Sequence, residues 1–195
     1  MLMVDTDPLE VERLLLGGEL LCPSCEGVLR PWGHARWRSS RWEHGSVRHR
    51  PRRASCSACP RTHVLLPASW LSRRADAVSV IGGALLRKAA GVGHRPIAAA
   101  LRRPVSTVRG WLRRFAARAE DVRVLFTGLL HALDPEPGPL VVSGSVFADA
   151  LEALGRAAAV AVVRLSPCSP WEFASRASAG GLLAPLSPTA GIWGR

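Results

Sequence analysis

Cys22-Pro23-Ser24-Cys25 and Cys56-Ser57-Ala58-Cys59 are two Cys-x-x-Cys pairs separated by 30 residues in a chain of 195 residues. Two residues between the cysteines let one tight turn direct both sulfur atoms to the same point, and two such turns complete a tetrahedral thiolate site for zinc. The spacing predicts that residues 21–67 form a zinc ribbon of short strands and loops. The expected ligands of the Zn²⁺ ion are Cys22, Cys25, Cys56 and Cys59. Because four thiolates fill its coordination, the ion is expected to be structural.

Paired cysteines have other uses, which the surrounding sequence disfavours. A Cys-x-x-Cys beside a strand–helix unit is typical of thioredoxin-like redox proteins, but neither pair has such a unit around it. Disulfides are disfavoured in a cytosolic chain. Four nearby histidines are alternative ligands, although we interpret each as a loop histidine on a polar surface: His34, His44, His49 and His63. Cys168 stands apart and is interpreted as a buried or incidental thiol.

The distribution of charge indicates an anionic partner, and nucleic acid is the leading candidate. The formal net charge is +11, and every basic residue except Lys88 is an arginine. We attribute part of this excess to codon bias, because the chain lacks Asn, Gln and Tyr and is rich in Ala, Arg, Gly and Pro. Position is more informative, since eight arginines and only one acid, Glu43, lie between Arg30 and Arg53. We expect Arg52 and Arg53 to contact DNA phosphates.

Three tryptophans, Trp32, Trp37 and Trp42, recur every five residues among these arginines. Basic residues interleaved with aromatic residues are typical of surfaces that bind nucleic acid by stacking and phosphate contact. A small ribbon also needs a core, and few other apolar residues are available to it. We therefore assign at least two of the three tryptophans to the core of the ribbon.

Downstream of the cysteines the apolar spacing becomes helical, with breaks at residues 91–93 and 102–104. The predicted fold class is mainly α with a small β zinc ribbon. The expected units are an N-terminal helix in 1–20, the ribbon in 21–67, a helical domain in 70–133, a stiff proline-rich linker in 134–139, and a C-terminal helical region with a loose tail in 140–195. The first helix is expected to be capped by Asp7 and opened by Pro8.

The segment from Arg95 to Phe115 predicts a helix-turn-helix, in which the second helix enters the major groove of DNA. Its two helices show apolar faces at helical spacing. The complementary face of the second helix is expected to contact DNA through Val105, Ser106, Arg109 and Arg113. An ordinary helical hairpin with no role on DNA is the alternative.

This segment resembles the helix-turn-helix of bacterial insertion-element transposases, whose second helix often reads Ser-Thr-Val-x-x-Trp-Leu. Ser106-Thr107-Val108 and Trp111-Leu112 match that pattern. Arg102 replaces the usual turn glycine, and Arg103 replaces the hydrophobic residue that usually follows. The resemblance therefore implies a helix-turn-helix with an irregular turn.

A wider resemblance covers roughly residues 10–125. The chain is similar to a family of short actinobacterial proteins that carry a domain of unknown function and are associated with mobile elements. The shared motifs are Cys22-Pro23-Ser24-Cys25, Pro31-Trp32-Gly33-His34, Pro51-Arg52-Arg53, residues 62–67 and the Trp-Leu helix. The resemblance implies a ribbon followed by helices. It also implies an accessory or end-recognition role in transposition, which is an inference by association.

Together these features predict a zinc-stabilised protein that binds double-stranded DNA, as a transposition accessory factor or a transcriptional regulator. We expect no enzyme, because transposases need about three carboxylates that hold two metal ions on a mixed sheet. The roughly 75 residues after the helix-turn-helix are too few for such a domain. The alternatives are an inactive or truncated transposase, and a protein–protein adaptor that does not bind DNA.

The location and further partners follow from the apolar segments. No stretch approaches the ~18 apolar residues of a membrane span, and the chain does not open with a basic and then apolar signal peptide. We expect a cytoplasmic, nucleoid-associated protein. The apolar end of the last long helix, residues 157–163, favours contact with a transposase or a second copy of the chain. Burial against the protein's own helices is the preferred alternative.

Overall fold

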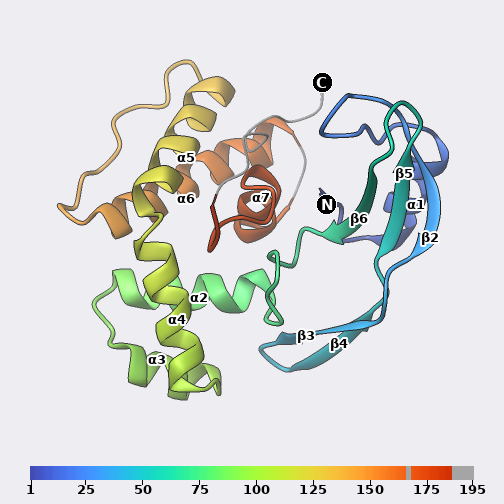
Figure 1. The fold of residues 1–195 in the computed structure, drawn as a ribbon. Coiled ribbons are helices and arrows are strands. Elements are labelled where there is room, and N and C mark those ends of the chain that lie inside the picture. Colours follow the sequence, from blue (N-terminus) through green and yellow to red (C-terminus); the bar gives the residue numbers. More distant parts are fainter. Residues whose placement is uncertain (166–167, 186–195) are drawn as a thin grey trace.

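Strands dominate the first third of the chain and helices the rest (Figure 1). The computed structural model describes residues 1–165 and 168–185, so the end of the predicted loose tail lies outside the described residues. The strands are β1 (Leu2–Val4), β2 (Leu29–His34), β3 (Arg38–Trp42), β4 (Gly45–His49), β5 (Arg52–Cys56) and β6 (Thr62–Pro67). The helices are α1 (Pro8–Leu16), α2 (Val78–Ala89), α3 (His94–Leu101), α4 (Val105–Ala116), α5 (Ala119–Leu133), α6 (Val146–Arg164) and α7 (Pro170–Ala177).

Four strands form a mixed sheet in the order β1-β6-β5-β2. The pairs β2–β5 and β5–β6 are antiparallel, whereas β1 is parallel to β6 and places Leu2 opposite Leu65. Strands β3 and β4 form a separate antiparallel pair. Helix α1 covers one face of the four-stranded sheet and shares a small core with it, composed of Val4, Val11, Leu15, Cys22, Leu29, Ala54 and Leu65.

The expectation of a mainly α fold is wrong, whereas the expected small N-terminal sheet is present beside the cysteines. Helices take up 45% of the described residues and strands 19%, and the cysteines lie beside a mixed four-stranded sheet, so the fold is α+β. The sheet was underestimated because β1 has three residues, too few to show an alternating pattern. Its hydrogen bonds come from β6, more than fifty residues later in the chain. Such non-local pairing leaves no local sequence signal.

Local sequence signals did predict the helices. The Asp7 side chain accepts a hydrogen bond of 2.9 Å from the Leu9 amide and caps α1, with Pro8 in the first turn. The expected breaks separate α2 from α3 and α3 from α4. Among the described residues, no helix combines the length and the apolar character that a membrane span requires.

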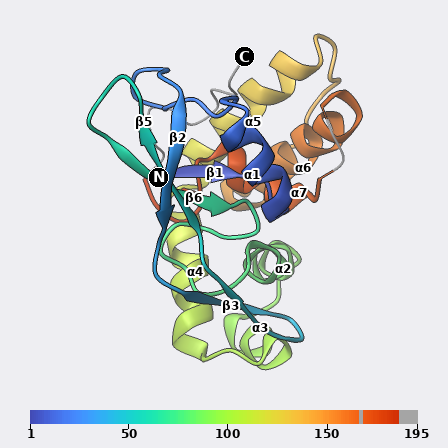
Figure 2. The ribbon, with the colours of Figure 1, turned by 90° about the vertical axis from the view of Figure 1, so that its right-hand side faces the viewer.

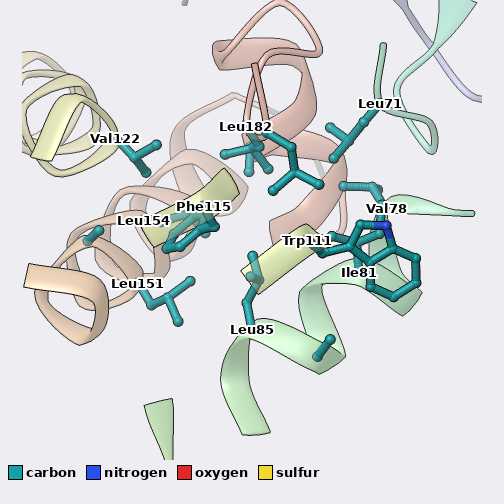
Figure 3. Packing of buried hydrophobic residues seen from close by; sticks show 14 of the residues in the cluster. Leu71, Val78, Ile81, Leu85, Trp111, Phe115, Val122, Leu151, Leu154 and Leu182 are labelled. Atoms are coloured by element: carbon teal, nitrogen blue, oxygen red, sulfur yellow. The ribbon is translucent and has the colours of Figure 1, made fainter. Parts of the chain in front are cut away.

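Helices α2 to α7 enclose a second, larger core. Figure 3 shows side chains of α2, α4, α5 and α6 converging there, together with Leu71 and Leu182. Ala157, Ala158 and Ala161 of α6 belong to this core, which confirms burial against the protein's own helices for that part of the apolar segment. Val163, in contrast, is 82% exposed.

Gly82 lies where α2 meets α7, and a Cβ there would lie 2.0 Å from Cε2 of Trp171. Gly82→Ala is therefore expected to displace Trp171 and to lower the free energy of unfolding by about 1–3 kcal/mol, although alanine favours helix over glycine. Urea unfolding followed by circular dichroism measures the change. Gly155→Ala in α6 is the control, since a Cβ there meets nothing within 4 Å. Equal stabilities of the two variants would contradict this packing.

Candidate metal centre and nucleic-acid interface

The four cysteines of the two pairs meet at one point. Their sulfur atoms all lie within 4.8 Å of one another, with 3.4 Å between Cys25 and Cys56 and 3.9 Å between Cys22 and Cys59. Four sulfurs bound 2.3 Å from one tetrahedral zinc ion lie about 3.8 Å apart. The predicted ligands are thus positioned to hold a metal ion, and the geometry is consistent with structural zinc.

Each pair of cysteines sits in a tight turn that points its sulfurs inward. The Cys22 amide donates to the Gly27 carbonyl at 2.8 Å, and the Cys56 amide donates to the Arg61 carbonyl at 3.0 Å. Gly27 is required by close approach, because a Cβ there would lie 2.9 Å from the Cys56 sulfur. The Arg61 side chain also donates to Ser24 Oγ at 2.9 Å, which ties the two turns together.

The hydrogen bonds of the turns favour a thiolate at Cys56 but not at Cys25. The Gly27 backbone lowers the pKa of the Cys25 thiol, but hydrogen bonds with the Cys56 and Cys59 sulfurs outweigh it and raise this pKa to about 12. The Ala58 amide donates to the Cys56 sulfur at 3.3 Å. This hydrogen bond is the main reason why the pKa of the Cys56 thiol falls to about 7. Zinc binds the deprotonated sulfur, so a lowered pKa prepares the residue for ligation.

His63 is buried and contacts one sulfur of the cysteine cluster. Its interpretation as a loop histidine on a polar surface is therefore wrong. His63 is only 5% exposed, and its Nε2 atom lies 3.4 Å from the Cys22 sulfur. Burial lowers the pKa of His63, which favours the neutral ring. A neutral ring that carries its proton on Nε2 donates to a Cys22 thiolate and orients it. The sequence did hold a signal, because His63 alternates with Leu65 along β6 and both are buried.

The remaining histidines are not part of the cluster. His34 and His44 are exposed, as expected. His49 is half-buried in β4, where its ring meets the Trp70 ring edge-on at 5.5 Å. Cys168 is half-buried, and burial raises the pKa of its thiol.

A short turn joins α3 to α4. Arg102 takes the left-handed conformation (φ 51°, ψ 47°) that a glycine would adopt here. Its side chain makes this conformation less favourable than it is for glycine. The turn therefore keeps a regular left-handed cap, where we expected irregular geometry.

Arg103 belongs to an ion triad, centred on the buried Asp76, that no sequence pattern indicated. Its Nε atom lies 2.6 Å from Oδ1 of Asp76, and its Nη2 atom donates to the Trp42 carbonyl at 2.8 Å. The second oxygen of Asp76 lies 2.7 Å from Nη2 of Arg41. The Asp76 side chain is 3% exposed and that of Arg103 is 11% exposed. The triad joins β3 to the α3–α4 turn, and Figure 2 shows β3 beside these helices.

Helix α4 has one buried and one exposed face. The buried residues are Val108, Trp111, Leu112 and Phe115. The four residues predicted to contact DNA are all exposed: Val105, Ser106, Arg109 and Arg113. The structure thus brings these four together on one open helical face.

Arg109 and Arg113 also line a shallow groove of about 300 Å³. Lys88 and His94 complete its polar lining, and Leu112, Ala116 and Phe147 are among its apolar residues. No acidic side chain lines the groove, and within residues 1–165 and 168–185 neither arginine forms an ion pair. Uncompensated positive charge therefore flanks the exposed face of α4.

Arg52 and Arg53 lie in the sheet, apart from α4 (Figure 1). Arg52 donates two hydrogen bonds of 2.8 Å to the Glu12 carboxylate, so its charge is compensated. Arg53 donates to Thr62 Oγ1 at 3.2 Å and keeps its charge uncompensated. The structure does not bring this pair together with the residues on α4.

The assignment of at least two tryptophans to the ribbon core is wrong. Trp32 is 59% exposed and Trp37 57%. Trp42 is partly buried, but it packs against the helical core. Residues from β1, α1 and β6 fill the space beneath the sheet, so the ribbon does not need tryptophan there.

Comparison of the chain with protein-family models, with curated proteins and with solved structures finds no match. The resemblance to insertion-element transposases stays a prediction from the motifs. The structure itself defines an α+β protein with four cysteines positioned for a metal ion.

Proposed function

We propose that this protein is stabilised by zinc and binds double-stranded DNA, with α3, the turn at 102–104 and α4 acting as a helix-turn-helix. The exposed face of α4 carries the proposal. It presents small side chains at its start and two arginines further along, as suits a helix that enters the major groove N-terminus first. The groove beside it is basic, which favours the phosphates that flank a bound helix.

The start of α4 supports the same orientation on DNA. In the described structure, no side chain caps this end of the helix. Its first amide groups are therefore available to a phosphate, which the helix dipole also attracts. Direct readout would favour guanine, because arginine pairs with guanine through two hydrogen bonds. The chain contains no Asn or Gln, the residues that pair in this way with adenine.

The biological role within this proposal is that of a transposition accessory factor or a transcriptional regulator. It rests on the motif resemblance of residues 95–115, and the protein acts in it by binding DNA without catalysing strand transfer. Zinc serves only to hold the N-terminal sheet and its turns in place.

Arg109→Ala tests the proposal. A target duplex is first selected from a random library, and binding is then measured by fluorescence anisotropy. The substitution is expected to cost about 1–3 kcal/mol at the preferred site and to relax the preference at one base pair, because a bidentate contact is lost. Arg164→Ala is the control: it removes one exposed positive charge at the end of α6, so both affinity and preference should change little.

Three outcomes would contradict the proposal. One is the absence of duplex binding at low salt, which would favour the adaptor alternative. The second is an Arg109→Ala protein with unchanged affinity and preference. The third is a selected site without guanine at the position that Arg109 governs.

A further inference from the structure

Strands β2 to β5 form one long, irregular hairpin. Strands β2 and β5 pair at its base, and β3 and β4 pair toward its tip. The Ala35 amide donates to the Pro51 carbonyl at 2.8 Å, and Arg50 Nε donates to the Ala35 carbonyl at 3.3 Å, so contacts continue across the join. We call residues 29–56 the long hairpin.

The long hairpin carries positive charge that the protein does not neutralise. Of its eight arginines, Arg41 pairs with Asp76 and Arg52 with Glu12. The other six form no ion pair within the described residues: Arg30, Arg36, Arg38, Arg48, Arg50 and Arg53. Glu43 is the only acidic residue in the long hairpin. A strongly basic ribbon is complementary to a polyanion.

Two exposed indole rings lie among these arginines. Trp32 and Trp37 each expose more than half of their surface, which is unusual for so large an apolar side chain. The Arg48 guanidinium carbon lies 5.2 Å from the centre of the Trp37 ring, within the range of a cation–π contact. Arg48 therefore contacts the Trp37 ring, while more than half of this residue stays exposed to a ligand.

We propose that the long hairpin binds single-stranded nucleic acid, with unpaired bases stacked on Trp37 and Trp32 and phosphates bound by the uncompensated arginines. Aromatic side chains on a basic surface bind single strands in this way, because every base has a π-face. A duplex leaves its base faces covered by neighbouring bases, so it uses the arginines but not the indoles. This surface is distinct from α4 and goes beyond the duplex binding proposed above.

The test uses the full-length, zinc-loaded chain and a fluorescein-labelled strand of 20 thymidylates, with binding measured by anisotropy at low salt. Trp37→Ala is expected to weaken binding about tenfold or more, because stacking of one base is lost. Trp37→Phe keeps an aromatic face and is expected to retain most of the affinity. Val163→Ala is the control, since it removes an exposed apolar side chain from α6 and should leave binding unchanged.

A matching strand of uridylates distinguishes the two sources of single strands. Binding of either strand that depends on Trp37 supports the proposal, and the ratio of the two affinities identifies DNA or RNA as the preferred ligand. Two results would overturn the proposal. One is the absence of binding to both strands at low salt, as expected if the exposed tryptophans contact another protein. The other is equal affinity of the wild-type and Trp37→Ala proteins, with circular dichroism showing that both are folded.

The two proposals fail separately. Arg109→Ala is expected to weaken binding of the duplex and to leave binding of the thymidylate strand unchanged. Trp37→Ala is expected to weaken binding of the thymidylate strand and to leave binding of the duplex unchanged. A chain that binds the strand but no duplex would refute the function proposed for α4 and leave the inference on the long hairpin standing. A chain that binds duplex but neither single strand would refute the inference on the long hairpin and leave the function proposed for α4 standing.

Discussion

Cys56→Ser is expected to remove the metal ion and to unfold the N-terminal region. A serine hydroxyl does not supply the thiolate that zinc prefers, and structural zinc in small domains contributes about 10–16 kcal/mol of apparent binding free energy. The core beneath the sheet consists of seven buried residues, and one of them, Cys22, is itself a ligand. So small a core is not expected to hold the sheet together without the ion. Elemental analysis should find about one zinc per wild-type chain and none in the variant, with loss of β-sheet signal in circular dichroism.

The matched control is Cys168→Ser, which lies outside the cluster and should keep the metal and the fold. A chelator or acidification should reproduce the effect of Cys56→Ser in the wild-type protein, because protons compete with the ion for the thiolates. A Cys56→Ser protein that retains one zinc per chain and an unchanged spectrum would show that the four sulfurs do not form a structural site.

Asp76→Ala is expected to lower the free energy of unfolding by about 3–5 kcal/mol, because it leaves a buried charge without its partner. The charge left unpaired in a buried position is that of Arg103, whose side chain is 11% exposed. Arg41 is nearly half exposed and is expected to regain solvation, so it adds little to the cost. Urea unfolding measures the change. Glu120→Ala is the control: its pair with Arg123 lies on the surface of α5 and is screened by solvent, so its loss should change the free energy of unfolding far less than Asp76→Ala does.

A double variant tests whether the unpaired charge causes that loss. Arg103 occupies a position at which the sequence resemblance predicts a hydrophobic residue. Asp76→Ala combined with Arg103→Leu removes both buried charges, and it is expected to recover much of the stability that Asp76→Ala alone loses. No recovery would mean that the Arg103 hydrogen bond to the Trp42 carbonyl, or the packing of the turn, matters more than the charge.

The sequence by itself determined the features that depend on neighbouring residues. Two residues between cysteines let one tight turn direct both sulfurs to the same point, and the four predicted ligands do meet. Helical periodicity and end signals such as Asp7-Pro8 act within a few residues, so the helices and their breaks were predicted closely. The two faces of α4 follow from the same periodicity.

Only the tertiary structure decided which partner each of the other side chains meets. The parallel pairing of β1 with β6, the ion pairs of Arg52 and Arg103, and the burial of His63 beside Cys22 all join residues more than twenty positions apart. The exposure of Trp32 and Trp37 was decided in the same way, because α1 and β1 fill the core that these tryptophans were expected to form. The residue types in the sequence determine which kinds of partner are available to a side chain, such as the carboxylates that can pair with an arginine. The choice among them depends on the packing of distant segments, and this packing leaves no periodic pattern in the sequence.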